Sequence, residues 1–124
     1  AVANEVTINA SLVYADSESS DVSLAIVDLI ASVATKKYIY YKQNIGFAAE
    51  EALTLGEVTA PGWAMFINRD ATNFVKLLTG TGGVIFAKLK PGEFALLRLG
   101  SGAQAPYAQA DTGATQLETL LILT

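Results

Sequence analysis

The clearest pattern in the chain is a strict alternation of residues near the N-terminus. Between positions 5 and 14, mostly polar residues alternate with Val6, Ile8, Ala10, Leu12 and Tyr14. This period of two is typical of a β-strand with one buried face. The stretch that follows, 15–21, is polar and acidic and predicts an exposed loop.

Segment 22–34 fits two patterns. Positions 22, 25, 26, 29, 30 and 33 are apolar, which matches one face of a helix that Asp21 would cap. Val22, Leu24 and Ile26 also alternate, and the many Val and Ile residues favour a strand. Because both flanks are strand-like, we expect extended structure here.

Short strand-like runs continue to the C-terminus. Turn-forming residues at 68–71, 80–83 and 90–92 divide the stretch from Pro61 to Leu99 into four runs. The runs expected as strands are 36–45, 50–56, 63–67, 73–78, 84–89, 94–99, 107–111 and 114–124. Runs of this length and spacing favour a sandwich or barrel. The sequence predicts an all-β protein, one antiparallel, jelly-roll-like β-sandwich domain over 1–124 with about eight or nine strands, arranged around 61–99.

The composition indicates a surface short of charge. Charged residues make up 16% of the chain and hydrophobic residues 52%, whereas globular domains average about 25% charged. We therefore expect another chain to cover part of the surface. All eight basic residues lie between positions 36 and 98, and the first 35 residues hold five acidic residues and no base. This asymmetry could steer subunits into register, although scattered solvated charge is the simpler explanation.

Charge and hydropathy also exclude some partners. The net charge of −4 argues against nucleic acid, whose phosphates require clustered Lys and Arg. The longest apolar run, 22–34, is interrupted by Asp28 and is shorter than the roughly 20 residues of a membrane helix. It also lacks the basic region of a signal peptide. We predict neither a nucleic-acid nor a membrane partner.

The candidates for chemistry are weak. The chain has no Cys and no His, which removes disulfides, thiolate metal sites and the usual Ser-His-Asp triad. Asp16, Glu18 and Asp21 are clustered but lack the calcium-loop pattern. Asp70 and Glu93 would serve as a carboxylate pair only if the fold brought them together, and we expect both to be turn charges. The glycine-rich stretch 80–83 lacks the Lys-Ser/Thr of a phosphate loop and predicts a hairpin turn. No enzyme activity, cofactor or metal site is predicted.

Aromatic residues offer an interface instead. Tyr38, Tyr40 and Tyr41 lie in one β-favouring run, and Trp63 is the single Trp. Such side chains either stack on a sugar or base, or pack at a sheet edge or subunit contact, which we consider the better interpretation. The candidate interface residues are Tyr38, Tyr40, Tyr41, Trp63, Arg69 and Asp70.

Several segments together resemble a family of small structural proteins from tailed bacteriophages. They are Gln43–Gly46, Glu50–Val58, Pro61–Trp63, Asn68–Val75, Leu89–Glu93 and Pro106–Asp111. The similarity runs from about residue 43 to the C-terminus, whereas 22–41 departs from the polar, Gly- and Ser-rich character expected there.

The resemblance implies a β-sandwich virion component on the capsid exterior. Its most specific form is a capsid decoration, or cement, protein that binds the major capsid protein as a homotrimer. A tail, baseplate or fibre-associated virion protein is the alternative within the same class. A carbohydrate-binding β-sandwich module using Tyr38, Tyr40, Tyr41 and Trp63 is the alternative from another class.

Overall fold

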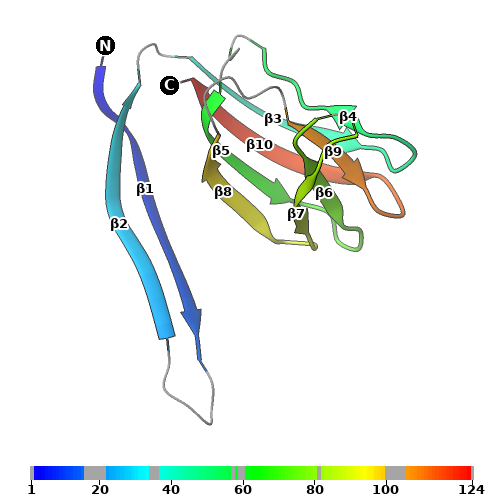
Figure 1. Ribbon diagram of the computed structural model, residues 1–124, viewed down its shortest axis with the longest axis horizontal. Coiled ribbons are helices and arrows are strands. Elements are labelled where there is room, and N and C mark those ends of the chain that lie inside the picture. The colour runs from blue at the N-terminus through cyan, green and yellow to red at the C-terminus, as the bar shows by residue number, and fades with distance from the viewer. Residues whose placement is uncertain are drawn as a thin grey trace. The chain divides into compact units, whose positions relative to one another are not determined.

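The computed structural model describes residues 2–15, 22–33, 37–56, 58, 61–80, 82–99 and 106–123. Within these ranges every regular element is a β-strand and every strand pair is antiparallel (Figure 1). The predicted all-β antiparallel class is confirmed. The sequence predicted one domain over 1–124, whereas the chain divides into two compact units, 1–36 and 37–124.

The first unit is a two-stranded hairpin, called the hairpin below. Strand β1 (Val2–Tyr14) pairs with β2 (Val22–Val33). The expectation of extended structure for the ambiguous segment is confirmed over 22–33. The acidic residues Asp16, Glu18 and Asp21 lie outside the described residues.

A β-bulge explains why segment 22–34 was ambiguous. Ala10 lies opposite Ile26 and Ile8 lies opposite Leu29, so β2 carries one extra residue between the two pairs. Asp28 accommodates it with a φ of 53°, and its N–H donates to Asn9 Oδ1 at 2.9 Å. The bulge shifts the alternation of β2 by one position. Apolar residues therefore recur at intervals of two and then three along one strand, which resembles the spacing of a helix.

The second unit, called the sandwich below, contains eight strands in two sheets. The strands are β3 (Tyr38–Ile45), β4 (Glu51–Ala52), β5 (Pro61–Asn68), β6 (Val75–Leu78), β7 (Ile85–Leu89), β8 (Phe94–Arg98), β9 (Tyr107–Ala110) and β10 (Thr115–Leu123). One sheet has the order β3-β10-β5-β8 and the other β4-β9-β6-β7. The described residues thus form ten strands where eight or nine were expected, because segments 22–33 and 107–110 both form paired strands. The strand expected over 50–56 is reduced to two residues.

Strand pairing in the sandwich is nested. β3 pairs with β10, β4 with β9, β5 with β8, and β6 with β7. Consequently the four strands of 61–99 do not form one sheet, since β5 and β8 belong to the first and β6 and β7 to the second. The β6–β7 connection is a hairpin, as predicted, with Gly82 at a φ of 65° and the Gly83 N–H donating to the Gly80 carbonyl at 2.9 Å.

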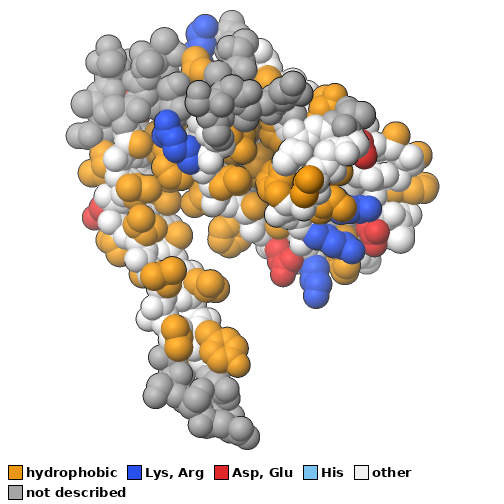
Figure 2. Space-filling view, viewed as in Figure 1, with side chains coloured by type: hydrophobic (Ala, Val, Ile, Leu, Met, Phe, Trp, Pro, Cys, Tyr) orange, Lys and Arg blue, Asp and Glu red, His pale blue; other side chains and the backbone are white. Residues whose placement is uncertain are grey.

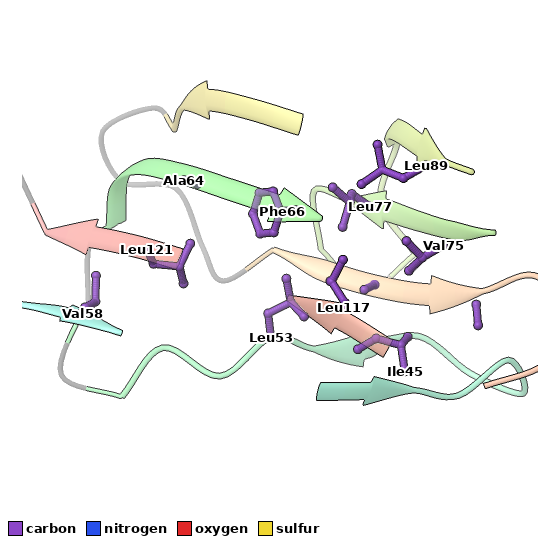
Figure 3. Packing of buried hydrophobic residues seen from close by; sticks show 12 residues of the cluster. Ile45, Leu53, Val58, Ala64, Phe66, Val75, Leu77, Leu89, Leu117 and Leu121 are labelled. Atoms are coloured by element: carbon purple, nitrogen blue, oxygen red, sulfur yellow. The ribbon is translucent and has the colours of Figure 1, made fainter. Parts of the chain in front are cut away.

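The two sheets share one apolar core. Alternation along β5 and β10 turns every second residue inward, and both sheets supply fully buried side chains (Figure 3). The largest of them are Phe66, Ile45, Leu77, Leu117 and Leu121. The sandwich therefore buries a full apolar layer within a single chain.

A buried amide ties the sheets together at one end. Asn68, the last residue of β5, is fully buried. Its Nδ2 donates to the carbonyls of Asn73 and Leu89 at 2.9 and 3.0 Å, and its Oδ1 accepts from the Asp70 N–H at 2.8 Å. Because its donors and its acceptor are all paired, this buried polar group fixes the β5–β6 turn without an unmet hydrogen bond.

Candidate functional site

The outward side of the β3-β10-β5-β8 sheet is largely apolar, and we call it the apolar face. The strand register arranges it in three rows across the sheet. The rows are Tyr38–Ile122–Trp63–Arg98, Tyr40–Leu120–Met65–Leu96 and Lys42–Glu118–Ile67–Phe94. Every one of these residues is half-buried or exposed.

This face departs from the usual pattern of an antiparallel sheet. A sheet that covers a core on one side normally presents polar residues on the other. Here β5 turns Trp63, Met65 and Ile67 outward while its inward residues fill the core. The Trp63 indole N–H is also buried without a hydrogen-bond partner among the described residues. Contiguous apolar surface of this kind usually marks a binding site for another molecule.

A small polar network borders the apolar face. The Tyr40 hydroxyl donates to Glu118, and Arg69 Nε donates to Glu118 Oε1 at 2.5 Å. These bonds, the one from Tyr40 first, lower the pKa of Glu118. The same contact with Glu118 raises the pKa of the Tyr40 hydroxyl. The network holds Tyr40 in place at the edge of the sheet, and its charges are already paired.

The structure brings together four of the six predicted interface residues. Tyr38, Tyr40 and Trp63 lie on the apolar face, with Arg69 beside it through Glu118. Tyr41 lies on the inner side of β3, where alternation places it with Ile45. Burial raises the pKa of its hydroxyl. The six residues therefore do not form one surface.

Asp70 has a role within its own turn. Its Oδ2 accepts the N–H groups of Thr72 at 3.0 Å and Asn73 at 2.7 Å, and these bonds lower its pKa. Glu93 Oε1 likewise accepts the Lys90 N–H at 2.8 Å. Each carboxylate accepts hydrogen bonds within its own turn, as expected.

The outward side of the other sheet carries a basic pair. Lys76 on β6 lies directly opposite Lys88 on β7. The Lys88 Nζ lies 5.1 Å from the centre of the Phe74 ring, and Gln109 on β9 lies opposite Lys76. Like charges directly opposite each other destabilise a sheet. A carboxylate from another molecule would relieve this repulsion.

The hairpin presents a second apolar surface, which we call the hairpin face. Because the bulge preserves the side on which the large residues lie, five cross-strand pairs share it. They are Val6–Ala31, Ile8–Leu29, Ala10–Ile26, Leu12–Leu24 and Tyr14–Val22. Hydrophobic side chains accordingly follow the length of the hairpin (Figure 2). The opposite side mixes polar residues such as Thr7, Ser11 and Ser23 with the exposed hydrophobic residues Val13 and Ile30.

The half of the hairpin face formed by residues 10–14 and 22–26 is exposed to solvent. Leu12 is 74% exposed, Leu24 77%, Tyr14 64%, Val22 65% and Ile26 44%. Burying one such side chain stabilises a structure by about 1.5–3 kcal/mol. An isolated two-stranded hairpin is at best marginally stable in water. The hairpin therefore gains most of its stability when another surface covers this face.

The sequence did not predict either the apolar face or the hairpin face. The alternation of 5–14 was visible, but it did not show that the alternating strand lies outside the sandwich. The pairs on the apolar face join residues far apart in the sequence, such as Leu120 and Met65. One signal in the sequence does indicate the apolar face, namely the apolar residues on both sides of the last strand, over 120–123.

No group of three or more metal-ligating side chains occurs in the part of the chain that the structure describes. Within the same residues, no helix is long and apolar enough to span a membrane. Neither a family model, nor a curated protein, nor a solved structure shows significant similarity to this chain.

Proposed function

We propose that this protein is a structural component of a tailed-bacteriophage virion. Its specific role would be that of a capsid decoration, or cement, protein that binds and stabilises the major capsid protein shell as a homotrimer. One observation carries the proposal: a chain with few charges has two apolar surfaces, the apolar face of the sandwich and the hairpin face. The resemblance of residues 43 onward to small phage structural proteins supports it.

We infer that the sandwich is a jelly roll. Its nested pairing and its two four-stranded sheets follow the arrangement expected of an eight-stranded jelly roll, a fold found in viral capsid and lectin domains. The fold alone does not assign a function. It is consistent with a rigid binding module that has no reaction to perform.

Adhesion of this kind does not require strong single contacts. A trimer that engages three neighbouring subunits at once gains affinity from effective concentration. Apolar surface suits the permanent contacts between copies, because obligate interfaces resemble a domain core cut in half. Weaker polar contacts then suffice against the shell.

We propose the Lys76–Lys88 surface for the contact with the shell. This basic pair is flanked by the ring of Phe74, so it would accept a carboxylate beside an apolar group. It lies on the β4-β9-β6-β7 sheet and leaves the apolar face free for contacts between copies.

The test is uptake of purified protein by undecorated capsid shells. We expect wild-type protein to cosediment with the shells and a Lys76→Glu, Lys88→Glu variant to lose most of this uptake. Lys90→Glu changes a basic residue in the turn after β7 and should retain the uptake. Binding to tail or baseplate parts without uptake by shells would replace the cement function with the tail function. Absence of binding to any virion part would refute both the cement and the tail function.

A carbohydrate-binding module is the second candidate. The observation that favours it is the row holding both Tyr38 and Trp63, with the Arg98 guanidinium 5.9 Å from the Trp63 ring. Tyr41 does not share that side of β3, so the aromatic set is smaller than predicted. Saturable binding on a glycan array that is lost in Trp63→Ala would promote this candidate over the virion one.

A further inference from the structure

We propose that the interior of the sandwich contains a binding site for one buried water molecule, formed by Tyr41 and Gln43 of β3 and Thr119 of β10. The inference does not depend on the proposed function, because it concerns the inside of one unit. The Tyr41 hydroxyl, Gln43 Oε1 and the Thr119 hydroxyl are all buried, and none has a hydrogen-bond partner among the described residues. Native proteins rarely leave buried polar atoms unpaired, because each unpaired group costs free energy.

The strand register brings these three side chains together. Tyr41 lies directly opposite Thr119, and Gln43 follows Tyr41 by two residues, so all three point to the inner side of the sheet. Gln43 is thereby diagonal to Thr119, within reach of a long side chain. Burial raises the pKa of the Tyr41 hydroxyl, while the Thr119 side chain and the Thr54 backbone lower this pKa in part, so both lie near the Tyr41 oxygen. A small molecule between these side chains would contact all three unpaired atoms.

The other buried polar residues of the sandwich have partners. Thr115 lies on the same side of β10 as Thr119, and its hydroxyl is 3.3 Å from the Phe74 carbonyl and 3.1 Å from the Gly113 carbonyl. The Asn68 amide is also paired, as described above. Because the unpaired atoms between the two sheets belong to one cluster in the part of the chain that is described, a single ligand accounts for all of them.

Hydrogen-bond chemistry selects water as this ligand. Gln43 Oε1 only accepts, whereas the hydroxyls of Tyr41 and Thr119 both donate and accept. A direct bond between the two hydroxyls would therefore leave Gln43 Oε1 without a donor. A water molecule between them donates to Gln43 and to one hydroxyl, and accepts from the other. Buried waters typically make about three hydrogen bonds, and globular proteins hold about one buried water per 27 residues.

The segment after β4 closes the site. β3 is eight residues long, whereas β4, at the edge of the other sheet, has only two. The chain that follows β4 instead runs along the inner side of β3, where a Cβ added to Gly56 would lie 2.9 Å from Ile39 Cδ1. Leu53 and Val58, near the two ends of this segment, are both buried in the core. The polar cluster is therefore enclosed within the sandwich and is not part of its surface.

A crystal structure that resolves ordered water tests the site directly. We expect a density peak within about 2.7–3.2 Å of Tyr41 Oη, Gln43 Oε1 and Thr119 Oγ1. Thr115 is the matched control, because it is the same residue type on the same side of the same strand and already contacts carbonyls. No peak is expected beside its hydroxyl. A Tyr41→Phe, Thr119→Val variant, which keeps the shapes of the side chains, should lose the peak.

A double-mutant cycle on the full chain provides a second readout in solution. Gln43→Met and Thr119→Val each remove one polar group that binds the water. Because the two groups share that water, the second substitution should change the folding constant several-fold less when the first is already present. Gln43→Met combined with Thr115→Val is the control, and the effects of these two substitutions should multiply.

The remaining outcomes overturn the inference. A direct hydrogen bond between the Tyr41 and Thr119 hydroxyls, with no density between them and Gln43, would remove the site. Effects of Gln43→Met and Thr119→Val that simply multiply would show that the two groups share no ligand. A peak beside Thr115 as strong as the one beside Thr119 would show that water enters the core without a specific site.

Discussion

The hairpin and the sandwich use the same sequence pattern to opposite effect. In the sandwich, alternation places Phe66 and Leu117 against a second sheet of the same chain, and both are fully buried. In the hairpin, alternation places Leu12 and Leu24 on one face, and both are about three-quarters exposed. Alternation thus predicts that a strand has an apolar side, but not which molecule covers it.

The largest expected effect comes from the sandwich core. Phe66→Ala should destabilise the sandwich by about 3–5 kcal/mol, because it leaves a cavity where the side chain is fully buried. Urea unfolding followed by Trp63 fluorescence measures it. Leu12→Ala, on the hairpin face, should change the stability of the sandwich by less than about 0.5 kcal/mol. Equal losses from the two substitutions would contradict the division of the chain into two units.

The next largest effect concerns the buried amide. Asn68→Ala removes the donors that satisfy the carbonyls of Asn73 and Leu89. Leaving buried polar groups unpaired costs about 1–3 kcal/mol each, so we expect a loss of roughly 2–4 kcal/mol in the same unfolding assay. The matched control is Asn44→Ala, since Asn44 is exposed on β3. A loss no greater than that of the control would show that Asn68 does not tie the sheets together.

A smaller effect tests the bulge of the hairpin. Asp28→Val places a β-branched residue at a φ of 53°, which costs about 1–2 kcal/mol. Amide hydrogen exchange should quicken across β1 and β2 while the sandwich keeps its protection. Asp28→Gly removes the strain and should preserve hairpin protection. Unchanged exchange in Asp28→Val would indicate that the bulge does not set the register.

The smallest effect is a dependence on pH. Hydrogen bonds from the Thr72 and Asn73 N–H groups lower the pKa of Asp70 below its ordinary value of 3.8. Their stabilising contribution is therefore present above that ordinary value and is lost as the pH falls through the lower folded-state value. Urea midpoints should fall between about pH 5 and pH 2 less steeply in Asp70→Asn than in wild type. Identical pH profiles would contradict a role for the Asp70 carboxylate in the turn.

Local patterns predicted the strands well because each depends on its own residues. Turn chemistry at 68–71, 80–83 and 90–92 correctly separated β5 to β8. The alternation of 5–14 correctly marked β1. The same patterns did not predict that consecutive strands such as β5 and β6 enter different sheets, because pairing between β5 and β10 is decided by tertiary packing.

The candidate site was predicted in part for the same reason. Aromatic composition indicated Tyr38, Tyr40 and Trp63, which do share a face. Tyr41 was grouped with them by proximity in sequence, although adjacent strand residues point to opposite sides. The β-bulge at Asp28 in β2 was not predicted either, because one added residue gives the apolar positions of the strand a spacing that resembles that of a helix.

Sedimentation velocity gives the most direct test of the claim that this protein acts by adhesion through its two apolar surfaces. The account predicts that the wild-type protein sediments as a homotrimer. A Leu12→Glu, Leu24→Glu variant should sediment as a monomer with an unchanged unfolding transition of the sandwich, while Ser11→Glu, Ser23→Glu on the opposite side stays trimeric. A wild-type protein that sediments as a monomer at every concentration, identically to the Leu12→Glu, Leu24→Glu variant, would contradict it.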